Sequence, residues 1–180
     1  PGGKRLAEKT MNARLGIIGG LSILGTTGVV IPYSCGAWIA SIHRGVDVAR
    51  AAALPHIAAT TGRTSEAGTR ALYGLPEQAL IEMGDFAGGL LKYVRNHPVP
   101  RLTIGGGFAK IAKLAAGHLD LHSRRSALDI NALATQLGDL GAAPETVARA
   151  SAVESGGALL EIARQAGLPI ADRVAHDACA

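Results

Sequence analysis

The feature that most constrains the fold is a repeated alternation of short apolar runs with helical patterns. The apolar runs at residues 29–31, 56–60, 79–83 and 102–104 have the length of strands, and each is followed by a turn and then by apolar residues spaced three or four apart. Because parallel strands need a crossover connection, usually a helix, this order predicts an α/β fold. We expect a mostly parallel sheet with crossover helices, Rossmann-like and three-layered, followed by a C-terminal helical segment.

Capping residues indicate where the helices begin. Thr64 or Ser65 is expected to cap a helix that runs to about Tyr73, and Asp85 is expected to cap the next one, which ends near His97. The glycines at 105–107 open a further helical pattern.

The pattern along the chain divides it into three parts. Residues 1–35 are a glycine-rich lead-in, expected to follow a missing N-terminal domain, and residues 29–125 form the parallel α/β sheet domain. Residues 126–180 carry amphipathic helical patterns without strands, the last at 159–166, and are expected to form a helical cap packed on the sheet.

Composition and charge narrow the class of protein. The net charge of +4 and an aromatic fraction of 3% are too low to argue for nucleic-acid binding. No apolar run approaches the ~20 residues of a membrane span. Cys35 and Cys179 lack the spacing of a zinc site or of a disulfide framework and, with Trp38, are expected to be packing residues. These features predict a cytoplasmic protein without nucleic acid or membrane as a partner, and they leave a homodimer open.

Ligands of parallel sheets bind beyond the carboxyl ends of the strands, and three polar or glycine-rich turns are expected at that edge. They lie at 60–65, 84–85 and 105–107. Their candidate ligand-binding residues are Thr61, Gly62, Thr64, Ser65, Asp85, Gly105, Gly106 and Gly107. Backbone amides at a helix start favour an anionic or dipolar guest. The alternatives are a helix cap with no further role at the first two turns and a tight, unliganded strand–helix turn at the third.

Polar residues follow the last of these turns. On a continuous helix, His118 and His122 would share a face, which is typical of metal ligands, with Asp120 and Ser123 nearby. No third ligand has a recognisable spacing and no Gly-x-Ser-x-Gly elbow exists, so a structural role for His118 is the favoured interpretation, and we expect no metal site. The glycines of residues 16–28 do not form a dinucleotide-binding or phosphate-loop fingerprint either.

Several segments together resemble the cobalt-precorrin-5B C1-methyltransferases of the CbiD type. The segments are Pro1-Gly-Gly, 12–20, Ser22-Ile-Leu-Gly-Thr-Thr-Gly, Thr61-Gly-Arg-Thr-Ser-Glu and 110–123. The resemblance runs from Pro1 to about Val174. It departs from some members at 106–110, where Gly-Gly-Phe-Ala-Lys has no histidine before the lysine.

The resemblance implies an enzyme of anaerobic cobalamin biosynthesis that methylates a ring carbon with S-adenosylmethionine as methyl donor. The implied partner is an anionic tetrapyrrole substrate, and cobalt enters only as part of it. Positively charged or polar side chains are expected to bind its carboxylates: Arg63, Lys110, Lys113, His122, Ser123 and Arg124. Neither the residues nor the resemblance assigns a catalytic residue or decides whether this fragment is active alone. The alternative is a non-catalytic α/β module that binds an anionic small molecule or serves in assembly.

Overall fold

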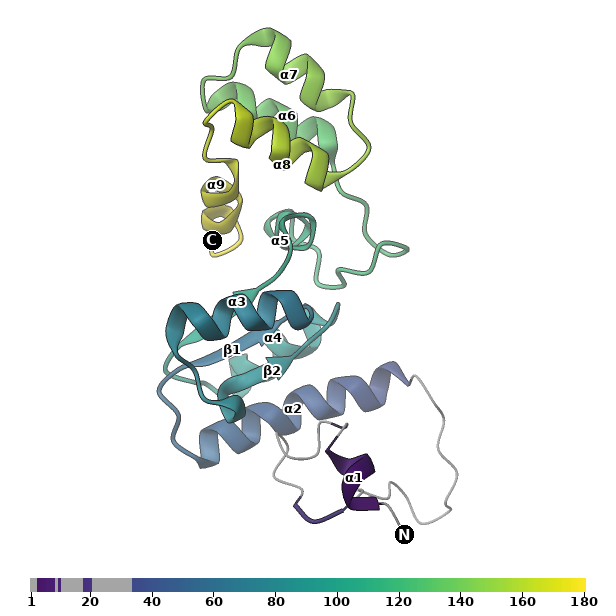
Figure 1. Cartoon of the computed structure of the whole chain (residues 1–180), viewed down its shortest axis with the longest axis vertical. Coiled ribbons are helices and arrows are strands. Elements are labelled where there is room, and N and C mark those ends of the chain that lie inside the picture. The colour runs from purple at the N-terminus through teal and green to yellow at the C-terminus, as the bar shows by residue number, and fades with distance from the viewer. Residues whose placement is uncertain (1–2, 9, 11–17, 21–33) are drawn as a thin grey trace. The chain divides into compact units, whose positions relative to one another are not determined.

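A computed structural model describes residues 3–8, 10, 18–20 and 34–180 (Figure 1). The chain divides between Gly105 and Gly106 into two compact units. In the first unit, helix α1 (Gly3–Ala7) is the one element before residue 34 among the described residues. The strand predicted at 29–31 and most of the glycine-rich lead-in lie outside the described residues.

The first unit contains a three-stranded parallel sheet with the order β2-β1-β3. The strands are β1 (Ile57–Thr60), β2 (Leu80–Glu82) and β3 (Leu102–Gly105). The connections between them contain α3 (Arg63–Tyr73), the short 3-10 turn η2 (Glu77–Ala79) and α4 (Ala87–Asn96). These three strands and their parallel direction confirm the sequence prediction. The strands form because short apolar runs bounded by glycine can be buried on both faces of a sheet, and every residue of β1 is buried.

Helices lie on both faces of this sheet. Helix α3 contacts all three strands, whereas α2 (Cys35–Ala51) contacts β2 and α4. Figure 1 shows α3 and α2 on opposite sides of the strands. Ile42 and Val46 of α2 are fully buried, together with Ile57, Met83 and Leu90. The buried residues of α2 lie three or four apart, so one face of the helix packs on the sheet.

A polar contact fixes α2 against α4. The hydroxyl group of Tyr93 donates to Oδ1 of Asp47 at 2.7 Å. The Tyr93 ring lies between the rings of His43 and His97, each with its centroid 4.0 Å away and nearly parallel. The ring stack and the hydrogen bond hold the two helices in one register.

The starts of α3 and α4 differ from the prediction. The N-cap of α3 is Gly62, and the hydroxyl group of Ser65 lies inside the helix, where it donates to the carbonyl oxygen of Gly62 at 2.8 Å. The N-cap of α4 is Phe86. The predicted caps at Thr64 or Ser65 and at Asp85 are therefore wrong. The N-cap of α3 lies two or three residues before the predicted one and that of α4 one residue after it, because strand pairing and packing determine where the helical conformation starts.

The second unit is helical. Its helices are α5 (Phe108–Ala115), α6 (Ile130–Asp139), α7 (Pro144–Ser151), α8 (Gly156–Gln165) and α9 (Ile170–Asp177). Its hydrophobic core contains Leu133, Leu137, Leu159, Ile170 and Val174. The sequence predicts helical patterns without strands in residues 126–180, and the last of them, at 159–166, corresponds to α8, but it misses α9. Helix α5 packs against α8 and α9 and so belongs to this unit.

Helix α5 is shorter than predicted. It ends at Ala115, and Gly117 adopts a left-handed conformation with φ of 83°, which stops the helix before His118. His118 and His122 therefore do not share a helix face, and that expectation is wrong. Among the described residues, no helix is both long and apolar enough to cross a membrane.

Candidate active site

The carboxyl ends of the three strands meet at one edge of the sheet. The amide of Thr61 donates to the carbonyl oxygen of Gly105 at 3.0 Å, which joins the ends of β1 and β3. The amides of Met83 and Gly84 both donate to the carbonyl oxygen of Thr60, at 2.9 and 3.2 Å, which joins the ends of β1 and β2. The turn after β1, the turn after β2 and Gly105 are thus neighbours, as the parallel sheet requires.

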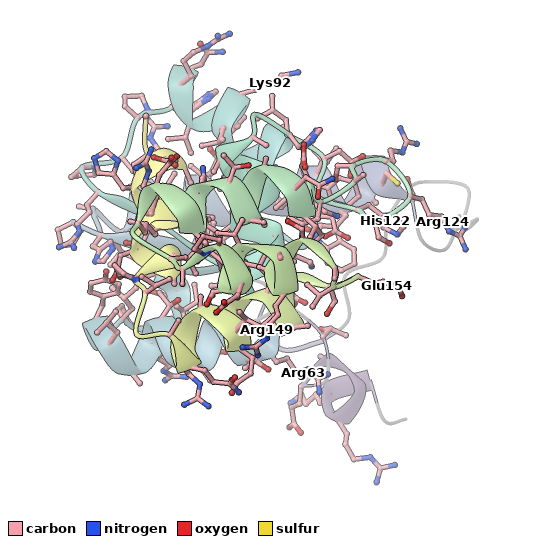
Figure 2. The ribbon with its side chains drawn as sticks, turned by 90° about the horizontal axis from the view of Figure 1, so that it is seen from above. Arg63, Lys92, His122, Arg124, Arg149 and Glu154 are labelled. Atoms are coloured by element: carbon pink, nitrogen blue, oxygen red, sulfur yellow. The ribbon has the colours of Figure 1, made fainter. Side chains whose placement is uncertain are left out.

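The turn after β1 leads directly into the first turn of α3. Thr61, Gly62 and Ser65 are partly buried, whereas Arg63 and Thr64 are exposed. Helix dipoles place partial positive charge at this point, where an anionic or dipolar group is stabilised. Figure 2 labels Arg63 among the exposed side chains. The turn offers hydroxyl groups and one guanidinium to a ligand at the edge of the sheet.

Thr60 is a candidate that the sequence prediction missed. Its side chain is fully buried at the end of β1. Its Oγ1 atom has no hydrogen-bond partner among the described residues. A buried hydroxyl group without a partner costs about 1–3 kcal/mol, and such atoms often mark a position where a ligand or water completes the site. The signal in the sequence is a single polar residue at the carboxyl end of an otherwise apolar strand.

Gly105 is a glycine because α3 packs closely on β3. A Cβ atom at this position would stand 2.5 Å from Oγ1 of Thr69 and 3.4 Å from Cγ2 of Thr60. A Cβ at Gly107, the N-cap of α5, would meet nothing within 4 Å. Close approach to another element of the protein therefore explains Gly105, and open space surrounds Gly107.

Trp38 packs as the sequence predicts, but it also reaches the surface beside the candidate site. Its indole N–H donates to the carbonyl oxygen of Glu82 at 3.2 Å, and its ring lies against Gly84, which has φ of 58°. The side chain packs there but stays 41% exposed. Trp38 therefore presents an aromatic surface beside the turn that carries Asp85, whose Oδ1 atom is buried. The expectation for the cysteines is wrong, because both Cys35 and Cys179 are exposed.

The polar residues at 118–125 form a turn in the second unit. Oδ1 of Asp120 accepts from the amide of His122 at 3.1 Å, and Nδ1 of His122 accepts from the amide of Arg124 at 3.1 Å. His122, Ser123 and Arg124 are exposed, and Figure 2 shows His122 and Arg124 on the loop between α5 and α6. The described residues contain no group of three or more His, Cys, Asp or Glu side chains that could hold a metal ion.

The two lysines of α5 differ in exposure. Lys110 lies in the first turn of the helix and is partly buried. Lys113 is 7% exposed, and its Nζ donates to the carbonyl oxygen of Leu121 at 3.3 Å. Lys113 is therefore an ammonium group inside the second unit rather than on its surface.

Comparisons with known proteins point to one family. The CbiD profile matches residues 1–32, and the profile of the CbiD C-terminal domain matches residues 120–180. No solved structure matches the chain.

Curated relatives agree with these profiles. The chain is 60% identical to the cobalt-precorrin-5B C(1)-methyltransferase of Methylorubrum extorquens over 98% of its own length and 49% of the relative. It is also 60% identical to the enzyme of that name from Bradyrhizobium sp., over 99% of the chain and 47% of the relative. It is 57% identical to the enzyme of that name from Paramagnetospirillum magneticum, over 99% of the chain and 49% of the relative. The chain thus spans about half the length of these relatives, and it belongs to the CbiD family.

Proposed function

We propose that this chain is part of a cobalt-precorrin-5B C1-methyltransferase that uses S-adenosylmethionine to methylate its substrate in anaerobic cobalamin biosynthesis. The observation that carries the proposal is the 60% identity, over 98% of the chain, to a relative with that name. Identity at this level, spread over both units, argues against a module that shares only a fold with the enzyme.

The edge of the sheet described above supports a binding site for the methyl donor. The crossover from β1 to β2 and the crossover from β2 to β3 run in opposite directions across the sheet. Right-handed crossovers then place α3 and α4 on opposite faces, and sheets of this kind bind ligands beyond the carboxyl ends of their strands. This Rossmann-like arrangement would let the polar turns receive the ribose and amino-acid groups of the donor.

We assign the roles of the candidate residues accordingly. The cofactor-binding set is Thr61, Gly62, Thr64, Ser65, Asp85, Gly105, Gly106 and Gly107, to which we add Thr60 and Trp38. The substrate-binding set, which would pair with carboxylates, is Arg63, Lys110, His122, Ser123 and Arg124. Lys113 is left out of this set because its side chain lies inside the second unit. In this proposal the buried hydroxyl group of Thr60 gains its missing partner when the donor binds.

Methyl transfer depends mainly on how the protein aligns the methyl donor with the ring carbon of the substrate. S-adenosylmethionine supplies an electrophilic methyl group, and displacement at that carbon requires the ring carbon and the sulfur atom to lie in line. Holding two reactants in such a geometry lowers the barrier by about 7–11 kcal/mol in favourable cases. The residues of this chain would bind and orient both molecules.

A methylation assay of the full-length protein tests the proposal. The protein is incubated with cobalt-precorrin-5B and S-adenosylmethionine labelled in its methyl group. We expect one labelled methyl group at ring carbon C-1. If the protein binds both molecules but transfers no label, the function is instead that of a non-catalytic module.

A further inference from the structure

The second unit contains a cavity of about 120 Å³ that the proposed methyl-donor site does not use. It is lined by α5, α6, α9 and the loop before α6. Its polar lining residues are Lys113, His118, Asp129, Gln136 and Asp177, and the remaining lining is alanine, leucine and valine. One ordered water needs about 10–15 Å³ by the same kind of measure, so the cavity has room for a small molecule.

The ammonium group of Lys113 lacks a charge partner. Its side chain is more than nine-tenths buried. Its Nζ makes one long hydrogen bond, 3.3 Å to the carbonyl oxygen of Leu121, and among the described residues it forms no ion pair. An ammonium group carries three donors, and burying it costs several kcal/mol unless an anion or further acceptors compensate. Lys113 therefore favours a ligand with a negatively charged oxygen.

The side-chain oxygen of Gln136 lacks a hydrogen-bond donor among the described residues. Its Nε2 donates to Oδ2 of Asp177 at 3.3 Å, and Asp177 also accepts from Nε of Arg173 at 3.0 Å. The other amide orientation would put two oxygens against each other, so the network fixes this one. Oε1 of Gln136 is then buried and has no partner among the described residues. It favours a ligand with a hydrogen-bond donor.

The charges of the lining select between ligand classes. The titratable residues of the lining are Lys113, His118, Asp129 and Asp177, and Asp177 also pairs with Arg173 at 3.0 Å. This balance opposes a dianion but suits a zwitterion that carries both an anionic and a cationic group.

We infer that this cavity binds an α-amino acid group. The carboxylate of the ligand pairs with Nζ of Lys113, and its ammonium group donates to Oε1 of Gln136. The source of the group is either a free small amino acid or the amino-acid end of a larger molecule. The inference goes beyond the proposed function and does not depend on it.

Nuclear magnetic resonance of the whole chain tests the inference directly. The chain is titrated with L-alanine, acetate and methylammonium while the side-chain signals of Gln136 and Lys113 are followed. We expect L-alanine to shift both signals saturably and to bind at least about tenfold more tightly than acetate or methylammonium, which each lose one charged contact. Equal affinities, or unmoved signals at about 50 mM L-alanine, would overturn the inference.

Variants locate the two contacts. Lys113→Met and Gln136→Met keep the side-chain length, and each should weaken L-alanine binding by about tenfold or more. Lys92→Met and Gln165→Met change exposed residues outside the cavity and should leave binding unchanged. If Lys113→Met fails to fold, Lys113→Arg keeps the charge and should retain binding. Loss of binding in the control variants, or full binding in both cavity variants, contradicts the assignment.

S-adenosylhomocysteine distinguishes the two sources. If it shifts the Gln136 signal and competes with L-alanine, the cavity takes the amino-acid end of the larger molecule. If L-alanine shifts the signal and S-adenosylhomocysteine does not, the ligand is a free amino acid. Either result supports the cavity as an amino-acid site, and neither depends on whether the protein transfers a methyl group.

Discussion

Oγ1 of Thr69 lies 2.5 Å from the point where a Cβ atom on Gly105 would stand. The hydroxyl group of Thr69 also donates to the carbonyl oxygen of Ser65 at 2.8 Å, so it is held in place by its own helix. We therefore expect Gly105→Ala to push α3 away from β3 and to lower the free energy of unfolding of the first unit by about 1–3 kcal/mol. Urea titration followed by the emission of Trp38, the single tryptophan of the chain, measures this change.

Two further variants test the cause. Adding Thr69→Ala to Gly105→Ala should recover part of the loss, because the clashing atom is removed. Gly68→Ala, in the interior of the same helix with nothing within 4 Å of the new Cβ, should instead raise the free energy of unfolding by about 0.5–1 kcal/mol. If Gly105→Ala and Gly68→Ala behave alike, close packing does not explain Gly105.

Thr60→Val should weaken ligand binding without lowering the free energy of unfolding. The substitution removes a buried hydroxyl group that has no partner among the described residues, so the unfolding free energy should stay the same or rise by up to about 1 kcal/mol. Binding of S-adenosylhomocysteine, measured by calorimetry, should weaken by about tenfold if the ligand supplies the missing partner.

Thr103→Val is the matched control on the neighbouring strand. Its hydroxyl group lies 2.8 Å from Nε2 of His56, so its removal should destabilise the unit by about 1 kcal/mol and leave ligand binding unchanged. Unaltered binding by Thr60→Val would remove Thr60 from the proposed site.

The emission of Trp38 should report on the proposed methyl-donor site. Trp38 is 41% exposed beside the turn at Gly84, and its ring centroid is 6.2 Å from that of Phe86. A ligand at the carboxyl edge should exclude water from the indole and shift its emission to shorter wavelength. Saturable calorimetric binding of S-adenosylhomocysteine without any change in emission would place the ligand elsewhere.

In the full-length protein, Lys110→Ala should weaken the proposed contact with the substrate carboxylates. A charge-assisted contact contributes roughly 1.5–3 kcal/mol, so the KM for cobalt-precorrin-5B should rise by about tenfold or more while kcat changes little. Lys92→Ala is the control, since Lys92 is exposed on α4 and Figure 2 shows its side chain pointing outward. An unchanged KM in the Lys110 variant would remove that residue from the substrate-binding set.

Stability of the first unit should depend on the protonation of His56. Partial burial, and to a lesser extent the positive charge of Arg101, lower the pKa of His56 below 6.5. The folded state therefore favours the neutral ring, whereas the unfolded chain takes up a proton more readily. The contribution of the neutral His56 ring to the free energy of unfolding is complete above about pH 6.5. It is lost progressively as the pH falls through that value towards the lower pKa of the folded state.

Urea titrations across this range, followed by Trp38 emission, measure the effect. His56→Phe should flatten the decrease of unfolding free energy at low pH, and His176→Phe, an exposed residue of the second unit, should not. Identical pH profiles for the wild type and His56→Phe would contradict the prediction.

The sequence predicts the sheet better than the ends of its helices. Strands β1, β2 and β3 follow from apolar runs too short for helices, because burial sets that pattern. Their parallel direction follows from the helical patterns that separate the runs. The helix starts near Ser65 and Asp85 were misplaced because a capping side chain expresses a local preference, whereas strand pairing determines where the helix begins.

Two further differences have identifiable causes. The last helical pattern predicted from the sequence ends at residue 166, but Pro169 is the N-cap of a further helix, α9, which the spacing of Ile170 and Val174 could have revealed. The buried state of Thr60 and the partial exposure of Trp38 depend on α3 and β2, which are distant in the sequence. Local patterns do not contain that information.

The boundary at Gly105–Gly106 has a consequence for folding. Ile42 and Leu90 are buried in one unit, and Leu137 and Leu159 in the other, so each unit has its own hydrophobic core. Melting of such a chain need not be a single all-or-none event. Amide hydrogen exchange should therefore resolve two levels of protection, one for each core, and a substitution in one core should lower mainly its own level.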